Sequence, residues 1–581
     1  MAKESLKEIS FMRSLCLGDI EEDIVFPFPK IKKEEAEVLR SVMDSLKSWL
    51  GNKDAEFRKW DKAGELPKDV LEEMKQMGLF SFIIDPENGG LGFGSMAYSR
   101  AIGELVRYDG SIALTAGAHS SIGMRGLIMF GTPAQKAKYL AKLASGEMIA
   151  AYCLTEAGAG SDAASIKTKA HLEGDTWVLN GEKIWITNGG IADFFTVFAQ
   201  TNTPEGKITA FIVTRDMKGV TTGPHEDKMG IRASSTTSVF FDNVRIPKDH
   251  VLGEVGKGFK VAVKILNNGR TGLGGGSIGG MRKVIDAAIG QAKQRQQFGK
   301  SISEFGLIKQ KFGHMIVECY ATEAVVNMVA GLIDNKYEDY AVEAAISKVF
   351  ASECLWRTVD EAMQVAGGNG YMSEFPYEKV MRDCRINRIF EGTNDILSLF
   401  IALTALQDAG KLLSDLAKAV NVGNVLSDPI KGFGVLVDYS KMRVAGATGI
   451  GRDTITKAHP KLRDYCIQFE GHVGQLTNMN DRLLRKYGKK IVDKQFALKR
   501  LGYIMIDMFA FIAVISRVTQ SIEEKGIDNC KQELDILHVF AGQVKGRINR
   551  NFGKIDFNDD ESIERLAEHA YSVGKYAWDI I

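Results

Sequence analysis

The feature that most constrains the fold of this chain is a change of hydrophobic period that occurs twice along the sequence. Residues 34–150 carry apolar side chains at helical spacing, as in EEAEVLRSVMDSLKSWL. From about 150 to 252 the pattern changes to short β-branched and aromatic runs bounded by turn residues, such as TWVLNGEKIWIT and ITAFIVT. Helical spacing then returns from 256 to 410. This order predicts a helical domain, a small antiparallel β domain and a bundle of long helices.

A second helical block follows the bundle, after a connection rich in Gly, Ser and Lys. Its apolar residues recur every three or four positions, which predicts a helix packed into a core; they are Leu501, Met505, Met508, Ile512 and Ile515. The predicted fold class is therefore α+β, mainly α. The predicted segments are an N-terminal helical domain (1–149), a β domain (150–255), a helical-bundle domain (256–410), a linker (411–460) and a C-terminal helical domain (461–581).

The charge balance and the cysteines narrow the class of protein. The 581 residues contain 74 Lys and Arg against 73 Asp and Glu, and such a balance disfavours a nucleic-acid-binding protein. The 7 cysteines are widely spaced and form no C-x-x-C motif, so we interpret them as buried thiols in a reducing compartment and predict no metal site.

The N-terminal residues and the longest apolar stretch indicate where in the cell the protein is located. The first residues, MAKESLKEISFMRSLCLGDIEED, lack the apolar core of a secretion signal and are too acidic for a transit peptide. The longest apolar stretch, Tyr503 to Ser516, is interrupted by Asp507 and is short for a membrane span. We therefore expect a cytoplasmic protein.

Two glycine patterns suggest nucleotide binding and need separate interpretations. Gly274, Gly276 and Gly279 fit G-x-G-x-x-G, but they do not directly follow a strand and no suitable acid stands about 20 residues later, so we interpret them as a flexible or close-packed run at a helix junction. The second pattern, Gly158 to Ser161, suits a loop whose N–H groups surround an anion or a polar ring.

That loop is the first of five motifs that occur in a fixed order. They are YCLTEAGAGSD, WITNGG, RQQFGK, QVAGGNGY and RIFEGTNDIL. Together they resemble the flavin-dependent acyl-CoA dehydrogenase family, from about Glu34 to Leu406. The extra helical block, with FPFPKI, GAHSSIG and KILNNGR, is most similar to the very-long-chain branch of that family. Ala157 stands where many members have proline, which affects the rigidity of the loop but removes no reactive group.

The resemblance implies α,β-desaturation of long- or very-long-chain acyl-CoA to trans-2-enoyl-CoA in fatty-acid β-oxidation. Glu391 matches the base that removes the α-proton, and flavin N5 takes the β-hydride. We expect Ile389 and Phe390 to desolvate this carboxylate, and Gly392 to leave room for the thioester. Some relatives carry the base just before the substrate-site arginine, but here that position is Gly269, which has no reactive side chain.

The resemblance also implies ligand contacts, with FAD as the cofactor. In the β domain the expected FAD contacts are Tyr152, Leu154, Thr155, Gly160, Ser161, Trp185, Ile186 and Thr187. A second set would reach the FAD of a neighbouring subunit or line a helix start beside the dinucleotide: Arg295, Phe298, Phe305, Ile308, Gln364, Val365, Gly367, Gly368, Thr393, Asn394 and Asp395. The expected acyl-CoA contacts are Ser161, Asn267, Arg270, Phe390 and Gly392.

The implied partners are acyl-CoA, an electron-transferring flavoprotein as electron acceptor, and a second copy of the chain in a homodimer. Two alternatives stay open: an acyl-CoA oxidase that uses oxygen directly, and a dual role in assembly of a respiratory complex. The chain-length preference also stays open, because the small residues Gly117, Ala118 and Gly123 suit either a deep acyl cavity or close helix packing.

The connection between the helical blocks suggests a membrane contact. Residues 431–463 contain seven basic side chains and two acids, with apolar residues interspersed. Such a segment either attaches the protein peripherally to the inner face of a membrane or is an ordinary exposed linker, and its glycines disfavour a continuous helix.

Overall fold

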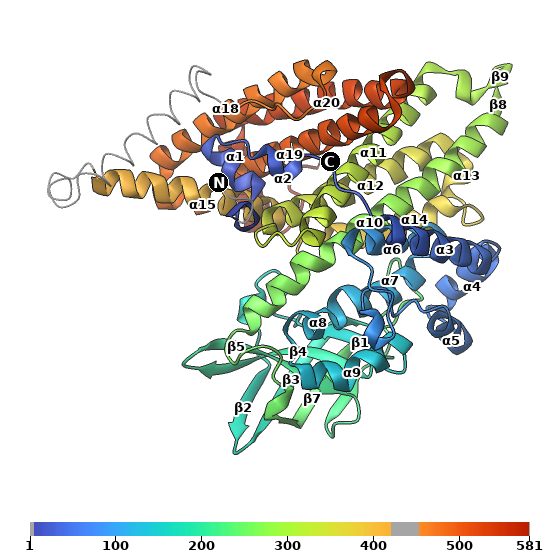
Figure 1. The fold of residues 1–581 in the computed structure, drawn as a ribbon, viewed down its shortest axis with the longest axis vertical. Coiled ribbons are helices and arrows are strands. Elements are labelled where there is room, and N and C mark those ends of the chain that lie inside the picture. The colour runs from blue at the N-terminus through green and yellow to red at the C-terminus, as the bar shows by residue number, and fades with distance from the viewer. Residues whose placement is uncertain (1–4, 420–452, 580–581) are drawn as a thin grey trace. The chain divides into compact units, whose positions relative to one another are not determined.

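A computed structural model describes residues 5–419 and 453–579, and its contacts divide the chain into two compact units. The first unit comprises Met1–Ser10 and Ile24–Ile396, and the second comprises Phe11–Asp23 and Leu397–Ile581. Most of the basic connection, for which the sequence leaves open a membrane contact or an ordinary exposed linker, lies outside the described residues. Figure 1 shows the helices and strands of the chain with their labels.

The first unit begins with a helical part. It contains η1 (Ser5–Glu8), α3 (Lys33–Leu50), α4 (Asp54–Ala63), α5 (Lys68–Gln76), η2 (Pro86–Asn88), α6 (Ser95–Tyr108), α7 (Gly110–Ala118), the π-helical turn η3 (His119–Gly123), α8 (Arg125–Phe130) and α9 (Pro133–Ser145). Local sequence sets several of these ends. At α9, Thr132 and Gln135 form a capping box around Pro133, and Gly146 closes the helix at a φ of 75°.

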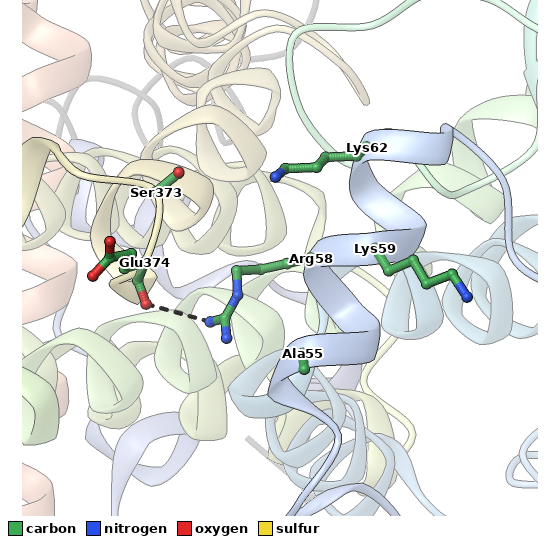
Figure 2. Close-up of a pocket in the computed structure, with 6 residues that line it drawn as sticks. All are labelled: Ala55, Arg58, Lys59, Lys62, Ser373 and Glu374. Carbon is green, nitrogen blue, oxygen red and sulfur yellow. Dashed lines mark hydrogen bonds between the residues drawn. The ribbon is translucent and has the colours of Figure 1, made fainter.

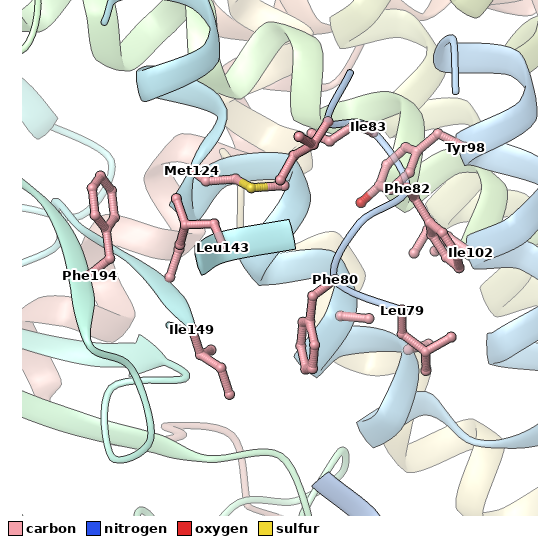
Figure 3. Close-up of a cluster of buried hydrophobic side chains, with 14 of the residues drawn as sticks. Leu79, Phe80, Phe82, Ile83, Tyr98, Ile102, Met124, Leu143, Ile149 and Phe194 are labelled. Carbon is pink, nitrogen blue, oxygen red and sulfur yellow. The ribbon is translucent and has the colours of Figure 1, made fainter. Parts of the chain in front are cut away.

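The core of this part continues into the β domain. Figure 3 shows Leu79 and Phe80, from the segment between α5 and α6, in one buried cluster with Leu143 of α9 and Phe194 of β4. The ring of Phe80 also meets the imidazole of the buried His119 edge-on, with 5.0 Å between the ring centroids. The helical part and the β domain therefore share one apolar core within this unit.

The β domain is a seven-stranded sheet. Its strands are β1 (Ala150–Cys153), β2 (Lys169–Glu173), β3 (Thr176–Thr187), β4 (Phe194–Thr203), β5 (Gly206–Thr214), β6 (Val220–Thr222) and β7 (Thr236–Pro247), with short helices η4 (Ala163–Ser165) and η5 (Lys248–His250). The strand order is β1-β4-β2-β3-β7-β6, and β5 also pairs with β4. Most pairs are antiparallel as predicted, but β4 pairs in parallel with β1 and, at Lys169 and Gln200, with β2.

Long helices complete the first unit. They are α10 (Gly258–Gln294), α11 (Gly306–Asp334), α12 (Ala341–Ala366), α13 (Gly368–Tyr371) and α14 (Pro376–Arg385), and α15 (Asn394–Ala419) begins here. A hairpin of β8 (Gln296–Gln297) and β9 (Lys300–Ser301), with η6 (Ile302–Glu304), follows α10, and η7 (Ile386–Arg388) follows α14. In Figure 1, α10 runs from the β domain to this hairpin.

The glycine run in α10 lies inside one continuous helix and not at a helix junction. At Gly275 a Cβ atom would lie 2.0 Å from the carbonyl oxygen of Ser99, and at Gly279 it would lie 1.9 Å from that of Gly103. Both carbonyls belong to α6, so the glycines allow the backbones of α6 and α10 to approach closely. The close-packed interpretation is therefore confirmed, and its placement at a junction is wrong.

The second unit is a helical assembly. Beside α15 it contains α1 (Phe11–Leu17), η8 (Pro460–Leu462), α18 (Arg463–Tyr487), η9 (Gly488–Asp493), α19 (Gln495–Lys525), η10 (Ile527–Asn529), α20 (Lys531–Asp556) and α21 (Asp560–Val573), while α2 (Glu22–Val25) spans the border in sequence. The predicted stripe from Leu501 to Ile515 is buried in its core, as expected. Phe11 of α1 packs against Phe509 of α19, with 6.4 Å between the ring centroids.

Two described helices, α11 and α19, are long and apolar enough to cross a membrane. The most apolar stretches of these helices are 67% and 89% buried inside the protein, which is typical of core helices. In α19, Asp507 is buried and forms an ion pair of 2.7 Å with Arg547 of α20. All seven cysteines are buried, as predicted.

Candidate active site

The segment that follows η7 makes a turn of unusual backbone geometry. Glu391 has a φ of 54° and Gly392 a φ of 93°, so two consecutive residues lie in the left-handed region. A glutamate there is strained, and such strain persists only where the surroundings hold it. The turn ends at Thr393, whose hydroxyl oxygen accepts the N–H of Ile396 at 3.3 Å and starts α15.

The carboxylate of Glu391 is enclosed by the protein. Its Oε2 atom is buried and accepts no hydrogen bond from the described residues. Burial raises the pKa of Glu391, while the charges of Arg270 and Lys348 act in the opposite direction. The side chain of Ile389 is 47% exposed, whereas Phe390 is half-buried. Burial of Ile389 therefore does not account for the desolvation of the Glu391 carboxylate. The charges that act on this carboxylate are Arg270 of α10 and Lys348 of α12.

Arg270 lies in the middle of α10 and is buried. Its Nη1 donates to Asn267 Oδ1 at 2.7 Å, and its Nη2 donates to the main-chain oxygen of Glu391 at 3.5 Å. Burial lowers the pKa of this guanidinium to about 10, and the charge of Glu391 raises it. The structure therefore brings together Asn267, Arg270 and Glu391, three residues that the motifs indicated.

Lys348 also reaches this site, although no motif indicated it. This lysine of α12 is fully buried, and its Nζ donates to the Gly392 carbonyl and to Asn394 Oδ1, both at 2.8 Å. The amide nitrogen of Asn394 donates to Ser352 at 3.0 Å and to Glu353 at 2.8 Å. The side chain of Asn394 is thus turned into the protein. The only sequence signal was a single lysine among the apolar residues of EAAISKVFA.

The structure also shows what surrounds the small residues near this site. A Cβ atom at Gly269 would lie 3.1 Å from Ile122 and 3.2 Å from the carbonyl oxygen of Ser121, so a base at this position would crowd η3. Gly123 is a close-packing glycine, because a Cβ there would lie 2.8 Å from the backbone of Ala150. At Gly117 the nearest atom would lie 4.0 Å away, on Ile102.

The glycine-containing loop after β1 is tied to β3 by buried polar contacts. Lys183 Nζ donates to Glu156 Oε1 at 2.7 Å and to the Leu154 carbonyl at 3.1 Å. The N–H of Ile184 also donates to the Thr155 carbonyl at 3.0 Å. These bonds bring Thr155 next to the strand that carries Trp185. No motif contains Lys183, and Glu156 lies in YCLTEAGAGSD without a predicted role, because the sequence does not show that both side chains are buried.

The same region offers an open surface for a planar ring. Trp185 lies at a bulge of β3, has a φ of 57° and is 63% exposed, and Thr187 is half-buried at the end of the strand. At Gly158 and Gly160 a Cβ would meet no described atom within 4 Å, so there is free space beside the loop that ends at the exposed Ser161. An exposed indole beside free polar backbone fits a flavin ring.

Three residues of this set have side chains that point elsewhere. Ile186 is buried in the core of the β domain. Leu154 is buried in the core shared with the helical part. The ring of Tyr152 packs on Phe198, and its hydroxyl donates to the Ala262 carbonyl at 3.4 Å. Burial, and secondly the charge of Glu391, raises the pKa of Tyr152, so this residue connects the loop to the site of Glu391.

A second group of motif residues gathers at the far end of α10. Arg295 is exposed at the end of the helix, and Phe298 in the following hairpin has a φ of 53° and is 93% exposed. Its ring meets that of Phe305 at 6.1 Å, with Ile308 one turn further on. Asn369 after the QVAGG motif donates to Gln291 of α10 at 3.5 Å. This contact brings the motif residues Gln364, Val365, Gly367 and Gly368 near the hairpin; Val365 is buried and the others are exposed.

The second group lies far along α10 from the site of Glu391. Arg295 follows Arg270 by 25 residues, and at about 1.5 Å per residue their Cα atoms lie roughly 37 Å apart. Asp395, at the start of α15, belongs with the first group and is exposed. The second group therefore presents an aromatic and cationic surface at a distance from Glu391.

A separate hollow in the first unit has no link to these motifs. Figure 2 shows Arg58 and Lys62 of α4 facing Ser373 and Glu374 across it. Its volume is about 430 Å³, and Arg58 donates to the Glu374 carbonyl at 3.4 Å. No predicted site residue lines this hollow.

The fold and the site together are those of a flavin-dependent oxidoreductase. The acyl-CoA dehydrogenase N-terminal, middle and C-terminal domain models match residues 36–147, 151–244 and 256–406. The model for the ACAD9/ACADV C-terminal domain matches residues 460–576. The chain belongs to the acyl-CoA dehydrogenase family and is an FAD-dependent enzyme of fatty-acid oxidation.

Comparison with individual proteins agrees with this assignment. The chain is 42% identical to the human very long-chain specific acyl-CoA dehydrogenase, mitochondrial, over 97% of this chain and 87% of that protein. The solved acyl-CoA dehydrogenase of Bacillus anthracis, complexed with FAD, has a TM-score of 0.79 and 31% identity over 93% of this chain and 91% of its own. A chain in a structure titled electron transferring flavoprotein of Acidaminococcus fermentans has a TM-score of 0.62 and 34% identity over 65% and 99%.

Proposed function

We propose that Glu391 is the base that removes the α-proton of a long- or very-long-chain acyl-CoA. The observation that carries this proposal is the buried Oε2 atom, which no described residue engages. A carboxylate that is desolvated is more basic than one in water, and the nearby cations Arg270 and Lys348 keep part of it ionised. The carboxylate therefore takes the α-proton at Oε2, while its main-chain N–H polarises the thioester carbonyl.

We assign FAD to the open surface beside Trp185. Thr155, Trp185 and Thr187 would hold the ring system, and Gly160 and Ser161 would leave room for it and for the acyl-CoA. When bound, FAD supplies the acceptor for the β-hydride of the substrate. Asn267, Arg270, Phe390 and Gly392 would border the thioester. The buried Lys183–Glu156 pair fixes the loop before binding, so less order has to be gained on binding.

The far group of residues supports a homodimer. The FAD of a second copy of the chain would be contacted by Arg295, Phe298, Phe305, Ile308, Gln364, Gly367 and Gly368, and by the buried Val365 through its main chain only. The dinucleotide near Glu391 would be contacted by Thr393, Asp395 and the main chain of Asn394, because the side chain of Asn394 is turned into the protein. The separation along α10 and the strong exposure of Phe298 favour this arrangement. We further propose an electron-transferring flavoprotein as the electron acceptor. We also propose that the chain divides into segments 1–149, 150–255, 256–410, 411–460 and 461–581.

The preference for long chains rests on the human relative and on Gly117, which has nearly free space beside it. A panel of saturated acyl-CoA substrates from short to very long tests it. A cytoplasmic location also stays a proposal, because the human relative is named a mitochondrial enzyme, and cell fractionation tests it. Peroxide formation in air would instead support the oxidase alternative, and capture of respiratory-complex subunits would support the additional assembly role.

The decisive experiment is the substitution Glu391→Gln. It preserves the shape of the side chain and removes its basicity. We expect the variant to keep its FAD, seen as the visible flavin absorption, and to lose nearly all desaturation of acyl-CoA. Wild-type turnover in this variant would refute the assignment of the base.

A further inference from the structure

A fully buried lysine contacts the turn that carries Glu391. Lys348 belongs to α12, is separated from Glu391 by 43 residues and has no exposed surface. Burying an ammonium ion is unfavourable unless hydrogen bonds replace its water. Here two acceptors do so, the carbonyl oxygen of Gly392 and Oδ1 of Asn394, each 2.8 Å from Nζ. Both acceptors belong to residues that lie one and three positions after Glu391 in the chain.

We propose that Lys348 is a positioning residue for the desaturation reaction, and that its ammonium holds the left-handed turn of Glu391 and Gly392 in the strained form that the base requires. This inference rests on the proposed role of Glu391. The carbonyl of Gly392 can reach Lys348 only while the peptide after Gly392 keeps its orientation, so this bond restricts the backbone torsions of Gly392, whose φ is 93°. Ser352 and Glu353 hold Asn394, the other partner of the lysine, in place.

The charge of Lys348 acts on the same carboxylate. The charged groups around the lysine are Glu391, Arg270 of α10, Glu353 of α12 and Arg388 of η7. Burial, which dominates, and the two arginines lower the pKa of Lys348 to about 7, while the two glutamates raise it. Below this pH the lysine is charged and favours the ionised form of Glu391. Removing it should therefore raise the pKa of the base.

The test compares three variants of the full-length holoenzyme. Lys348→Met keeps the length of the side chain and removes the charge and the donors, and Lys348→Arg keeps the charge. Lys379→Met is the matched control, because the side chain of Lys379 in α14 is only 12% exposed and forms ion pairs of 3.0 Å with Asp109 and 2.7 Å with Asp383. For each we would measure FAD content, thermal stability and kcat/KM for a saturated acyl-CoA as a function of pH.

We expect Lys348→Met to retain FAD and to shift the acid limb of kcat/KM upward by about one pH unit, with about tenfold lower activity below that limb. Lys348→Arg should restore the wild-type midpoint of the acid limb of kcat/KM. Lys379→Met should lose stability but keep the limb of the wild type. A merely structural role of Lys348 would lower stability without moving the pH profile, and that result would overturn the inference.

Three further outcomes can be distinguished. If Lys348→Met does not fold, Lys348→Gln, which keeps a neutral donor, replaces it, and failure of both variants to bind FAD overturns the inference. If Glu391→Gln, assayed alongside, retains turnover, the proposed function fails whatever Lys348 does. If Glu391→Gln is inactive with FAD bound and Lys348→Met shows the wild-type pH profile, only the inference about Lys348 fails.

Discussion

Lys183 donates a hydrogen bond of 2.7 Å to Glu156, and both side chains are buried. The same ammonium holds the Leu154 carbonyl, so a single side chain of β3 fixes the loop that precedes Gly158. Glu156 in turn accepts the N–H groups of Lys167 and Thr168, at 2.5 and 3.0 Å. This network shapes the loop before any ligand is present.

We therefore expect Lys183→Met to lose both stability and FAD. The change leaves the Glu156 carboxylate buried without its cation, which costs about 3–5 kcal/mol. Thermal unfolding and the ratio of flavin to protein absorbance measure the two losses. Lys142→Met is the control, since Lys142 pairs with Glu147 at the surface and such a pair contributes about 0–1 kcal/mol. Equal behaviour of the two variants would contradict the prediction.

The burial of Glu391 predicts the pH dependence of the reaction. A raised pKa means that the carboxylate takes up a proton at a higher pH than an ordinary glutamate does. Because only the ionised form is a base, kcat/KM should fall as the pH decreases, with its midpoint above the usual carboxyl range. FAD content and thermal stability over the same pH range show whether the enzyme stays folded. A midpoint at or below the ordinary range would disprove the prediction.

The close crossing of α6 and α10 predicts a strong effect of a single methyl group. Gly275→Ala would place its Cβ 2.0 Å from the Ser99 carbonyl, so the helices must separate, and we expect a loss of about 1–3 kcal/mol. Gly290→Ala in the same helix is the matched control, because a Cβ there meets no described atom within 4 Å. It should instead stabilise α10 by about 0.5–1 kcal/mol. Denaturant unfolding distinguishes the two, and equal stability would count against the close crossing.

The exposed aromatic ring in the hairpin after α10 predicts a role in assembly. We expect Phe298→Ala to weaken dimerisation and to lower FAD content, because the ring is 93% exposed within one chain. Phe557→Ala removes a ring that is 83% exposed in the second unit and serves as the control. Sedimentation velocity and flavin absorbance are the measurements. A Phe298→Ala protein with the oligomeric state and the flavin content of the wild type would argue against a shared site.

The basic connection predicts binding to anionic vesicles. Two of its basic residues, Lys457 and Arg463, already form ion pairs with Asp23 and Glu470, so the test uses others. We expect replacement of Lys431, Lys441, Arg443 and Arg452 by glutamate to abolish co-sedimentation with phosphatidylserine vesicles. The same change at the exposed Lys32, Lys33, Lys47 and Lys59 should preserve it. Equal pelleting of the two variants would show that the segment is an ordinary linker.

The sequence indicated the class of fold and the motif residues, but not how the buried charges complete the site. Hydrophobic periods and motif order predicted the helical and β regions, because both signals are local. Lys348 and Lys183 escaped detection, since a lysine in sequence gives no sign that distant segments will bury it. The sequence also did not show the strand register at Ile186, which turns the side chain of this predicted FAD contact towards the core. The roles of Glu391 and of the FAD residues stay predictions.

The contact between Phe11 and Phe509 affects how the chain folds during its synthesis on the ribosome. The segment Phe11–Asp23 leaves the ribosome long before its core partners in α18 and α19, which are made hundreds of residues later. Until then its apolar side chains lack their native cover, which makes the nascent chain prone to aggregation or dependent on chaperones. A protein made from residue 24 onward would be spared that delay, but would expose the surface on α19 that Phe11 covers.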